Sequence, residues 1–171
     1  LEASRHWTAA GERALERHAH VESVRHLQAA LDALGQAPPD PEHPHRELEI
    51  RLLLGRAISA VQGFAAPELE TNYTRALALM DAEADRPNDH RLPLLWHLWA
   101  YRNSNGLLRS GLEIAERMLR EASIPSTRFL AHETVGLSAH FLSDFPKARL
   151  HLEAATELFR GIGAHTAAST S

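Results

Sequence analysis

Apolar residues recur at spacings of three and four along most of the chain, and polar residues fill the positions between them. This period is typical of amphipathic helices, and no segment shows the two-residue alternation of a half-buried strand. The pattern breaks where glycine and proline gather, because these residues end helices. The sequence therefore predicts an all-α protein. The predicted helices are residues 5–19, 20–35, 44–62, 67–80, 89–103, 107–122, 129–141 and 145–160.

The last two segments predict a pair of helices folded back on each other across the turn at Leu142-Ser143-Asp144. Gly136 lies inside the first helix of this pair, and Ala148 and Ala155 lie on one face of the second. Small residues let two helix axes approach closely, so we expect all three to be buried where the helices touch. One such pair cannot bury its apolar surfaces alone, which favours a repeat.

Aligning the other segments on this pair shows the repeat about four times. Equivalent places in the first helices hold Trp7-x2-Ala10-Gly11, Arg51-x2-Leu54-Gly55, Leu95-x2-Leu98-Trp99 and His132-x2-Val135-Gly136. Equivalent places in the second helices hold Ser23-x3-Leu27-x2-Ala30, Leu69-x3-Tyr73-x2-Ala76, Gly111-x3-Ala115-x2-Met118 and Ala148-x3-Leu152-x2-Ala155. The units are residues 5–35, 44–82, 89–122 and 126–160, and we expect one domain over 1–163 with a flexible tail at 164–171.

This pattern resembles the tetratricopeptide repeat (TPR), with its Trp, Leu-Gly and Tyr positions and Ala-x3-Phe in the partner helix. The units recur every 37 to 46 residues, measured between Ala30, Ala76, Met118 and Ala155, against about 34 in that family. Trp99 also stands where the packing glycine belongs. The resemblance implies a TPR-like α-solenoid, in which about four antiparallel helix pairs form a right-handed superhelix.

Three longer strings resemble one bacterial family more narrowly. They are AGERALERHAHVESVRHLQAAL, ELEIRLLLGRAISAVQGFAAPELETNYTRALAL and FLSDFPKARLHLEAA. In that family a TPR region follows a signal-transduction ATPase domain, often with an adenylate-cyclase-like or DNA-binding domain at the other end. The resemblance implies a regulatory region of a multidomain signalling protein or transcriptional regulator. We expect the sequence to be a piece of such a protein, since it begins without methionine and ends in a polar AHTAASTS. We also expect that protein to be cytoplasmic.

Composition narrows the classes of partner. Eighteen basic and 22 acidic residues give a net charge of −4, with no long run of either sign. Such a chain lacks the basic face that phosphate contacts need, so we expect no nucleic-acid partner. Cysteine is absent, which excludes disulfides and thiolate metal sites. No apolar run approaches the roughly 20 residues of a membrane span.

Candidate chemistry is sparse. The chain has twelve histidines, but no two are three or four residues apart, the usual spacing of metal ligands on one helix. His132-Glu133 begins like the HExxH zinc motif, but Gly136 stands where its second histidine belongs. No phosphate-binding loop and no GxSxG nucleophile turn is present. We therefore predict no enzyme, no catalytic residue, no metal and no cofactor.

The repeat geometry places one side of each first helix toward a concave groove. From it we predict the partner-binding residues Arg56, Trp96, Asn103, Glu133 and His140, with Thr8, Glu12, Leu52 and Leu137 as further groove positions. For Trp96, groove anchor and inter-repeat packing are both open, whereas Trp7 and Trp99 are expected to fill the core. For Arg56, the alternative is a local pair with Glu12 or Glu49.

These features predict an interaction or sensor module that binds a peptide, a protein or another domain of its parent protein. One alternative is a structural spacer or an oligomerisation arm whose groove stays empty. The other is a small-molecule pocket next to Trp96. Because no capping helix follows the last repeat, we expect the apolar side of residues 150–158 to be partly exposed or covered by another copy.

Overall fold

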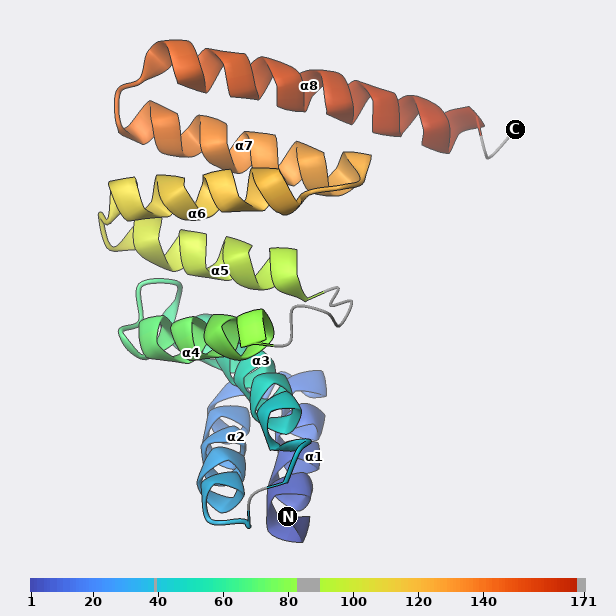
Figure 1. The fold of residues 1–171 in the computed structure, drawn as a ribbon. Coiled ribbons are helices and arrows are strands. Elements are labelled where there is room, and N and C mark those ends of the chain that lie inside the picture. The colour runs from blue at the N-terminus through green and yellow to red at the C-terminus, as the bar shows by residue number, and fades with distance from the viewer. Residues whose placement is uncertain (39, 83–89, 169–171) are drawn as a thin grey trace. The chain divides into compact units, whose positions relative to one another are not determined.

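The computed structural model describes residues 1–38, 40–82 and 90–168, and within them it contains only helices and no strand (Figure 1). The all-α prediction is confirmed. The helices are α1 (Glu2–Glu16), α2 (His20–Gly35), α3 (His43–Gln62), α4 (Glu68–Ala82), α5 (Arg91–Ser104), α6 (Leu108–Glu121), α7 (Pro125–Phe141) and α8 (Phe145–Ala168). Residues 83–89 of the predicted 81–90 linker, which include the expected start of the fifth helix, lie outside the described residues.

The chain divides into two compact units, Leu1–Leu94 and Leu95–Ser171, with the boundary inside α5. In the first unit α1 packs on α2, α2 on α3 and α3 on α4, and α1 also contacts α3. In the second unit α6 packs on α7 and α7 on α8 (Figure 1). The second helix of one pair thus packs on the first helix of the next, which is the stacking of an α-solenoid.

Helix ends follow the breakers in the sequence, with two exceptions. Gly63 ends α3 with a φ of 79°, and Ser143 turns the chain between α7 and α8 with a φ of 62°. The first helix ends at Glu16 rather than Ala19, because His18 adopts a φ of 58°. The predicted end of the last helix at Gly161–Gly163 is wrong, since α8 continues to Ala168. The single domain with a tail at 164–171 stays a prediction.

The aligned glycines are the points where the two helices of a pair meet. A Cβ atom on Gly11 would lie 2.6 Å from Leu27 Cγ, and one on Gly55 would lie 2.3 Å from Tyr73 Cε1. On Gly136 it would lie 2.7 Å from Leu152 Cγ. The large side chain of the second helix therefore occupies the space that the missing Cβ leaves. Gly136, Ala148 and Ala155 are all buried, as predicted.

The third pair inverts this arrangement of sizes. Trp99 stands in the glycine place, and Ala115 stands in the place of Leu27. Both are buried, which confirms the core role predicted for Trp99. Its indole Nε1 donates a hydrogen bond of 2.8 Å to Ser138 Oγ on α7.

The core role predicted for Trp7 is wrong, because 37% of its surface is exposed. Its indole lies nearly parallel to the His26 ring of α2, with the ring centroids 5.4 Å apart and an interplanar angle of 21°. Stacking on a single ring covers only part of a tryptophan. The tryptophan at this position of the tetratricopeptide-like pattern therefore forms a contact between the two helices at the surface of the pair.

Candidate interaction groove

A hollow of about 280 Å³ lies between α1 and α3 in the first unit. It is lined by Ser4, Arg5, Thr8, Ala9, Glu12, Arg46, Glu49 and Ile50. These two helices are the first helices of consecutive pairs, so the hollow lies on the side where the repeat predicts a groove. Thr8 and Glu12 line this hollow, whereas Leu52 and Arg56, the groove positions predicted on α3, are not among its lining residues.

Hydrogen bonds and burial hold the floor of this hollow in place. The Thr8 hydroxyl donates to the Ser4 carbonyl oxygen at 2.9 Å, and the buried Ser4 hydroxyl donates to the Ala30 carbonyl oxygen at 3.0 Å. Ile50 is buried from the α3 side. The polar groups of the floor are thus satisfied within the protein, which leaves the charged residues around it for contact with a ligand.

Both signs of charge surround the hollow. Among the described residues no ion pair holds Arg5 or Glu12, whereas Arg46 pairs with Asp40 at 2.7 Å. The hydrogen bond from Arg46 holds the pKa of the Asp40 carboxyl below its usual range. Glu49 lies 3.4 Å from the His45 ring. An extended ligand with acidic and basic side chains would find partners of opposite charge here.

The five residues predicted to bind a partner fall into both units. Arg56 is exposed on α3 in the first unit, and in the described part of the chain it pairs with neither Glu12 nor Glu49. The other four lie in the second unit, Trp96 and Asn103 on α5 and Glu133 and His140 on α7. A single strip through all five stays a prediction.

Within the second unit the repeat gives Trp96 and Glu133 the place that Thr8 has in the first. Each helix carries two of the predicted residues seven positions apart, and therefore on one face. The bond from Trp99 to Ser138 joins α5 to α7. Trp96 is half-buried, and its ring centroid lies 6.1 Å from that of Trp99. It therefore combines contact with the core and access to solvent.

Asn103 and His140 have different surroundings. The Asn103 amide donates to the Trp99 carbonyl oxygen at 3.2 Å and packs against Gly111 of α6. His140 is exposed at the turn between α7 and α8, with its ring edge-on to Phe141 and Phe145 at centroid distances of 5.9 and 5.8 Å. Asn103 is thus held mainly within the protein, whereas His140 faces solvent.

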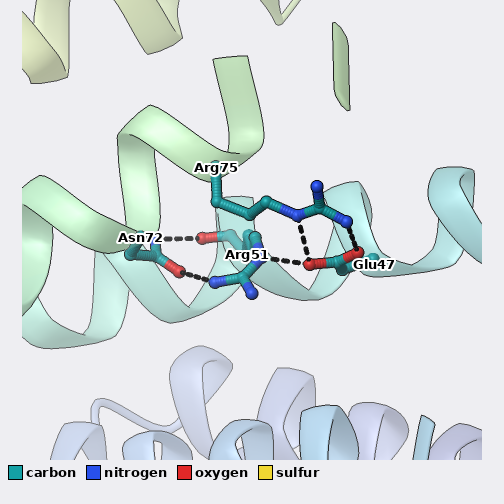
Figure 2. A network of polar contacts seen from close by, with 4 residues as sticks. All are labelled: Glu47, Arg51, Asn72 and Arg75. Atoms are coloured by element: carbon teal, nitrogen blue, oxygen red, sulfur yellow. Dashed lines mark hydrogen bonds and ion pairs between the residues drawn. The ribbon is translucent and has the colours of Figure 1, made fainter. Parts of the chain in front are cut away.

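A polar network joins α3 to α4 (Figure 2). Arg75 donates to both carboxylate oxygens of Glu47, at 2.9 and 2.7 Å, and Arg51 donates to the same carboxylate at 2.8 Å. The buried Asn72 donates to the Arg51 carbonyl oxygen at 2.8 Å. The hydrogen bond from Arg75 is the main cause of the lowered pKa of Glu47. This network fixes the second pair of helices and leaves its polar groups satisfied.

Sequence reasoning missed a histidine pair between α7 and α8. The Nδ1 atoms of His132 and His151 lie 3.1 Å apart, and their ring centroids lie 5.1 Å apart. Burial is the first cause that lowers the pKa of both rings. The two histidines lie on different helices, so no ligand spacing within one helix reveals them. The repeat alignment held the signal, because His132 shares the place of Trp7 and His151 that of His26.

Three large apolar side chains of α8 are exposed at separate places along the helix. Phe145, Leu150 and Phe159 are exposed by 60%, 66% and 63%. A hollow of about 570 Å³ lies between the start of α7 and the end of α8, lined by Ile124, Pro125, Ser126, Glu157, Leu158, Gly161 and Ile162. Within residues 150–158, Leu150 is exposed and Leu158 is half-buried, which agrees with the predicted partial exposure.

In residues 1–38, 40–82 and 90–168, no three or more histidine, aspartate or glutamate side chains are grouped closely enough to hold a metal ion. In the same ranges no helix combines the length and the apolar character that crossing a membrane requires.

No family model and no curated protein matches the chain. Among solved structures, the apo form of RapI matches with a TM-score of 0.80 and 16% identity, over 95% of this chain and 58% of that one. A kinesin light chain of Podosopora anserina with nearly identical TPR-like repeats matches with a TM-score of 0.49 and 13% identity, over 92% and 95%. The chain has the fold of a TPR-like α-solenoid. It spans less than two thirds of RapI, and the likeness concerns the fold alone.

Proposed function

We propose that the chain is the interaction module of a larger bacterial signalling or regulatory protein, and that it binds a peptide, a protein or a sister domain along its first helices. The observation that carries this proposal is the open, charged hollow between α1 and α3. The solenoid fold supports it, because stacked helix pairs present extended surfaces to ligands. The resemblance of three sequence strings to a family of signalling ATPases supports the parent context.

The hollow suits an extended peptide with mixed side chains. Arg5 and Arg46 would contact acidic groups, and Glu12 would contact a basic group, while Ile50 and Ala9 provide an apolar floor. Within each unit, the equivalent face of the first helices would carry further contacts. There Arg56 adds a cation, Trp96 an aromatic ring, Asn103 an amide, Glu133 a carboxylate and His140 an imidazole.

A phage-displayed random peptide library selected against the chain tests the groove. We expect enriched peptides whose affinity, measured by calorimetry, falls at least about tenfold in Arg5→Glu and in Glu12→Lys, because each change reverses a charge at the hollow. Arg25→Glu on the exposed side of α2 is the matched control and should bind as the wild type does. No enrichment, or unchanged affinity in both groove variants, would contradict the proposal.

The exposed apolar side chains of α8 favour a second function, self-association as an oligomerisation arm. The hollow of about 570 Å³ at the end of α8 supports it, because apolar surface that is open to solvent marks interaction sites. Light scattering at rising protein concentration should show an increase in mass, and Leu150→Glu should abolish it. A strict monomer at high concentration would exclude this second function and leave the groove proposal untouched.

A further inference from the structure

At one position of the repeat, a side chain of the first helix contacts a side chain of the second helix, and three of the four pairs use different residue types there. In the first pair Trp7 stacks on His26. In the second, Arg51 Nη1 lies 3.5 Å from Asn72 Oδ1. In the fourth, His132 meets His151. The fold therefore accepts stacking, polar and histidine pairs at this place, so its packing does not require two histidines.

The histidine pair differs from the stacked pair in what its rings present to each other. The rings of the first pair are nearly parallel, at 21°, whereas those of His132 and His151 are tilted by 37° with their Nδ1 atoms 3.1 Å apart. Zinc–imidazole bonds of about 2.0–2.1 Å place two ligand nitrogens about 2.9–3.4 Å apart for angles between a right angle and the tetrahedral angle. The separation found here lies within this range.

We propose that His132 and His151 form a two-histidine site for a divalent late transition metal such as Zn²⁺, Ni²⁺ or Cu²⁺, which clamps α7 to α8. Without metal, one ring donates its Nδ1–H to the Nδ1 of the other. When the ion binds, the donor ring carries its proton on Nε2 instead, so both Nδ1 lone pairs face the metal and no net proton leaves. Both rings are half-buried, and water completes the coordination from the exposed side.

The charges around the two histidines limit their affinity for a metal ion. Lys147 and the Glu116 carboxylate form an ion pair near His151, so the two charges largely offset each other. Arg128 is the further cation that acts on His132, and it opposes a bound ion. Two nitrogen ligands against this background favour the metals that bind imidazole most strongly, so Cu²⁺ should bind most tightly and Mg²⁺ should not bind.

Calorimetry and thermal unfolding of the metal-free chain in a non-chelating buffer test the site. We expect one ion per chain at the site, with Cu²⁺ tighter than Ni²⁺ and Zn²⁺. With free metal at about 100 times its Kd, Tm should rise by roughly 5–10 °C for a chain of this length. No binding heat together with an unchanged Tm would overturn the proposal.

Matched variants assign the effect to this pair. His132→Gln and His151→Gln should each abolish the Tm rise, with circular dichroism confirming that the helices remain. His18→Gln is the control, because His18 and His20 are another close pair, with ring centroids 5.8 Å apart, and it should keep the rise. Gln variants that bind metal as tightly as the wild type would overturn the site.

A third variant keeps the test decisive if the glutamine variants unfold. His151→Cys introduces the only thiol of the chain and replaces one proposed ligand by another. Titration with Co²⁺ should then produce a thiolate-to-cobalt charge-transfer band in the near ultraviolet. The same band should disappear in His151→Cys with His132→Gln. Absence of the band in the single variant, or its persistence in the double variant, would exclude joint ligation by the two positions.

Discussion

Adding a single methyl group at Gly55 tests whether the aligned glycines fix the distance between paired helices. In Gly55→Ala the new Cβ would lie 2.3 Å from Tyr73 Cε1 and 2.7 Å from its hydroxyl oxygen. Tyr73 is 1% exposed, so its ring cannot move aside without displacing other core residues. Overpacking of this kind costs about 1–3 kcal/mol, and the higher helix propensity of alanine returns about 1 kcal/mol. Because a contact of 2.3 Å places the overpacking cost at the upper end of its range, we expect a net loss of about 1–2 kcal/mol.

Urea denaturation followed by circular dichroism measures this loss as a change in the free energy of unfolding. Gly161→Ala is the matched control, because a Cβ atom at that helical position has nothing within 4 Å. The control should be neutral or more stable by up to about 1 kcal/mol, since only helix propensity changes. The two substitutions thus have opposite expected signs. A Gly55→Ala variant as stable as the wild type would refute the close-packing argument.

Three further outcomes follow from packing and charge. Ala148→Leu should lower the free energy of unfolding by about 1–3 kcal/mol, because Ala148 is buried between the last two helices, and an unchanged melting midpoint would contradict this. Glu47→Gln should cost about 1–2 kcal/mol at neutral pH. The lowered pKa of Glu47 contributes stability above the ordinary glutamate pKa, and this is lost as pH falls through the folded value, so the cost in an acid titration should vanish at low pH. Trp96→Ala should reduce the affinity of a selected peptide by about 2 kcal/mol or more, and a loss seen only in stability would exclude Trp96 as an anchor.

The helices could be predicted because their signals are local. A period of three to four residues, interrupted at Gly63 and at the turn around Ser143, determines where helices lie and where they stop. The end of α8 was predicted wrongly for the same reason. Glycine permits a helix to end but does not force it, and Gly161 lies within the helix.

The site could be predicted only in part, because periodicity identifies a face of a helix and not the helix that packs against it. The alignment placed Thr8 and Glu12 on the correct side of α1. It did not identify Arg5 and Arg46, which line the same hollow nearer the start of each helix. Trp7 was assigned to the core from a family position, although the size of its neighbour decides its burial, and that neighbour is a histidine ring.

The core position of each helix pair combines one small and one large side chain, whereas the residue types at the other positions of the repeat differ between pairs. In the fourth pair the small residue is Gly136 and the large one is Leu152, whereas in the third pair Trp99 is large and Ala115 is small. The space between the two helices is therefore filled from the second helix in one pair and from the first helix in the other. The cross-helix place one turn earlier on the first helix has no such constraint on residue type. It holds a stacked ring in one pair and two histidines in another. The side chains there are partly exposed, so water can form the hydrogen bonds that the partner side chain does not form. A solenoid of divergent repeats can therefore vary ligand-binding groups at such places without a change of fold.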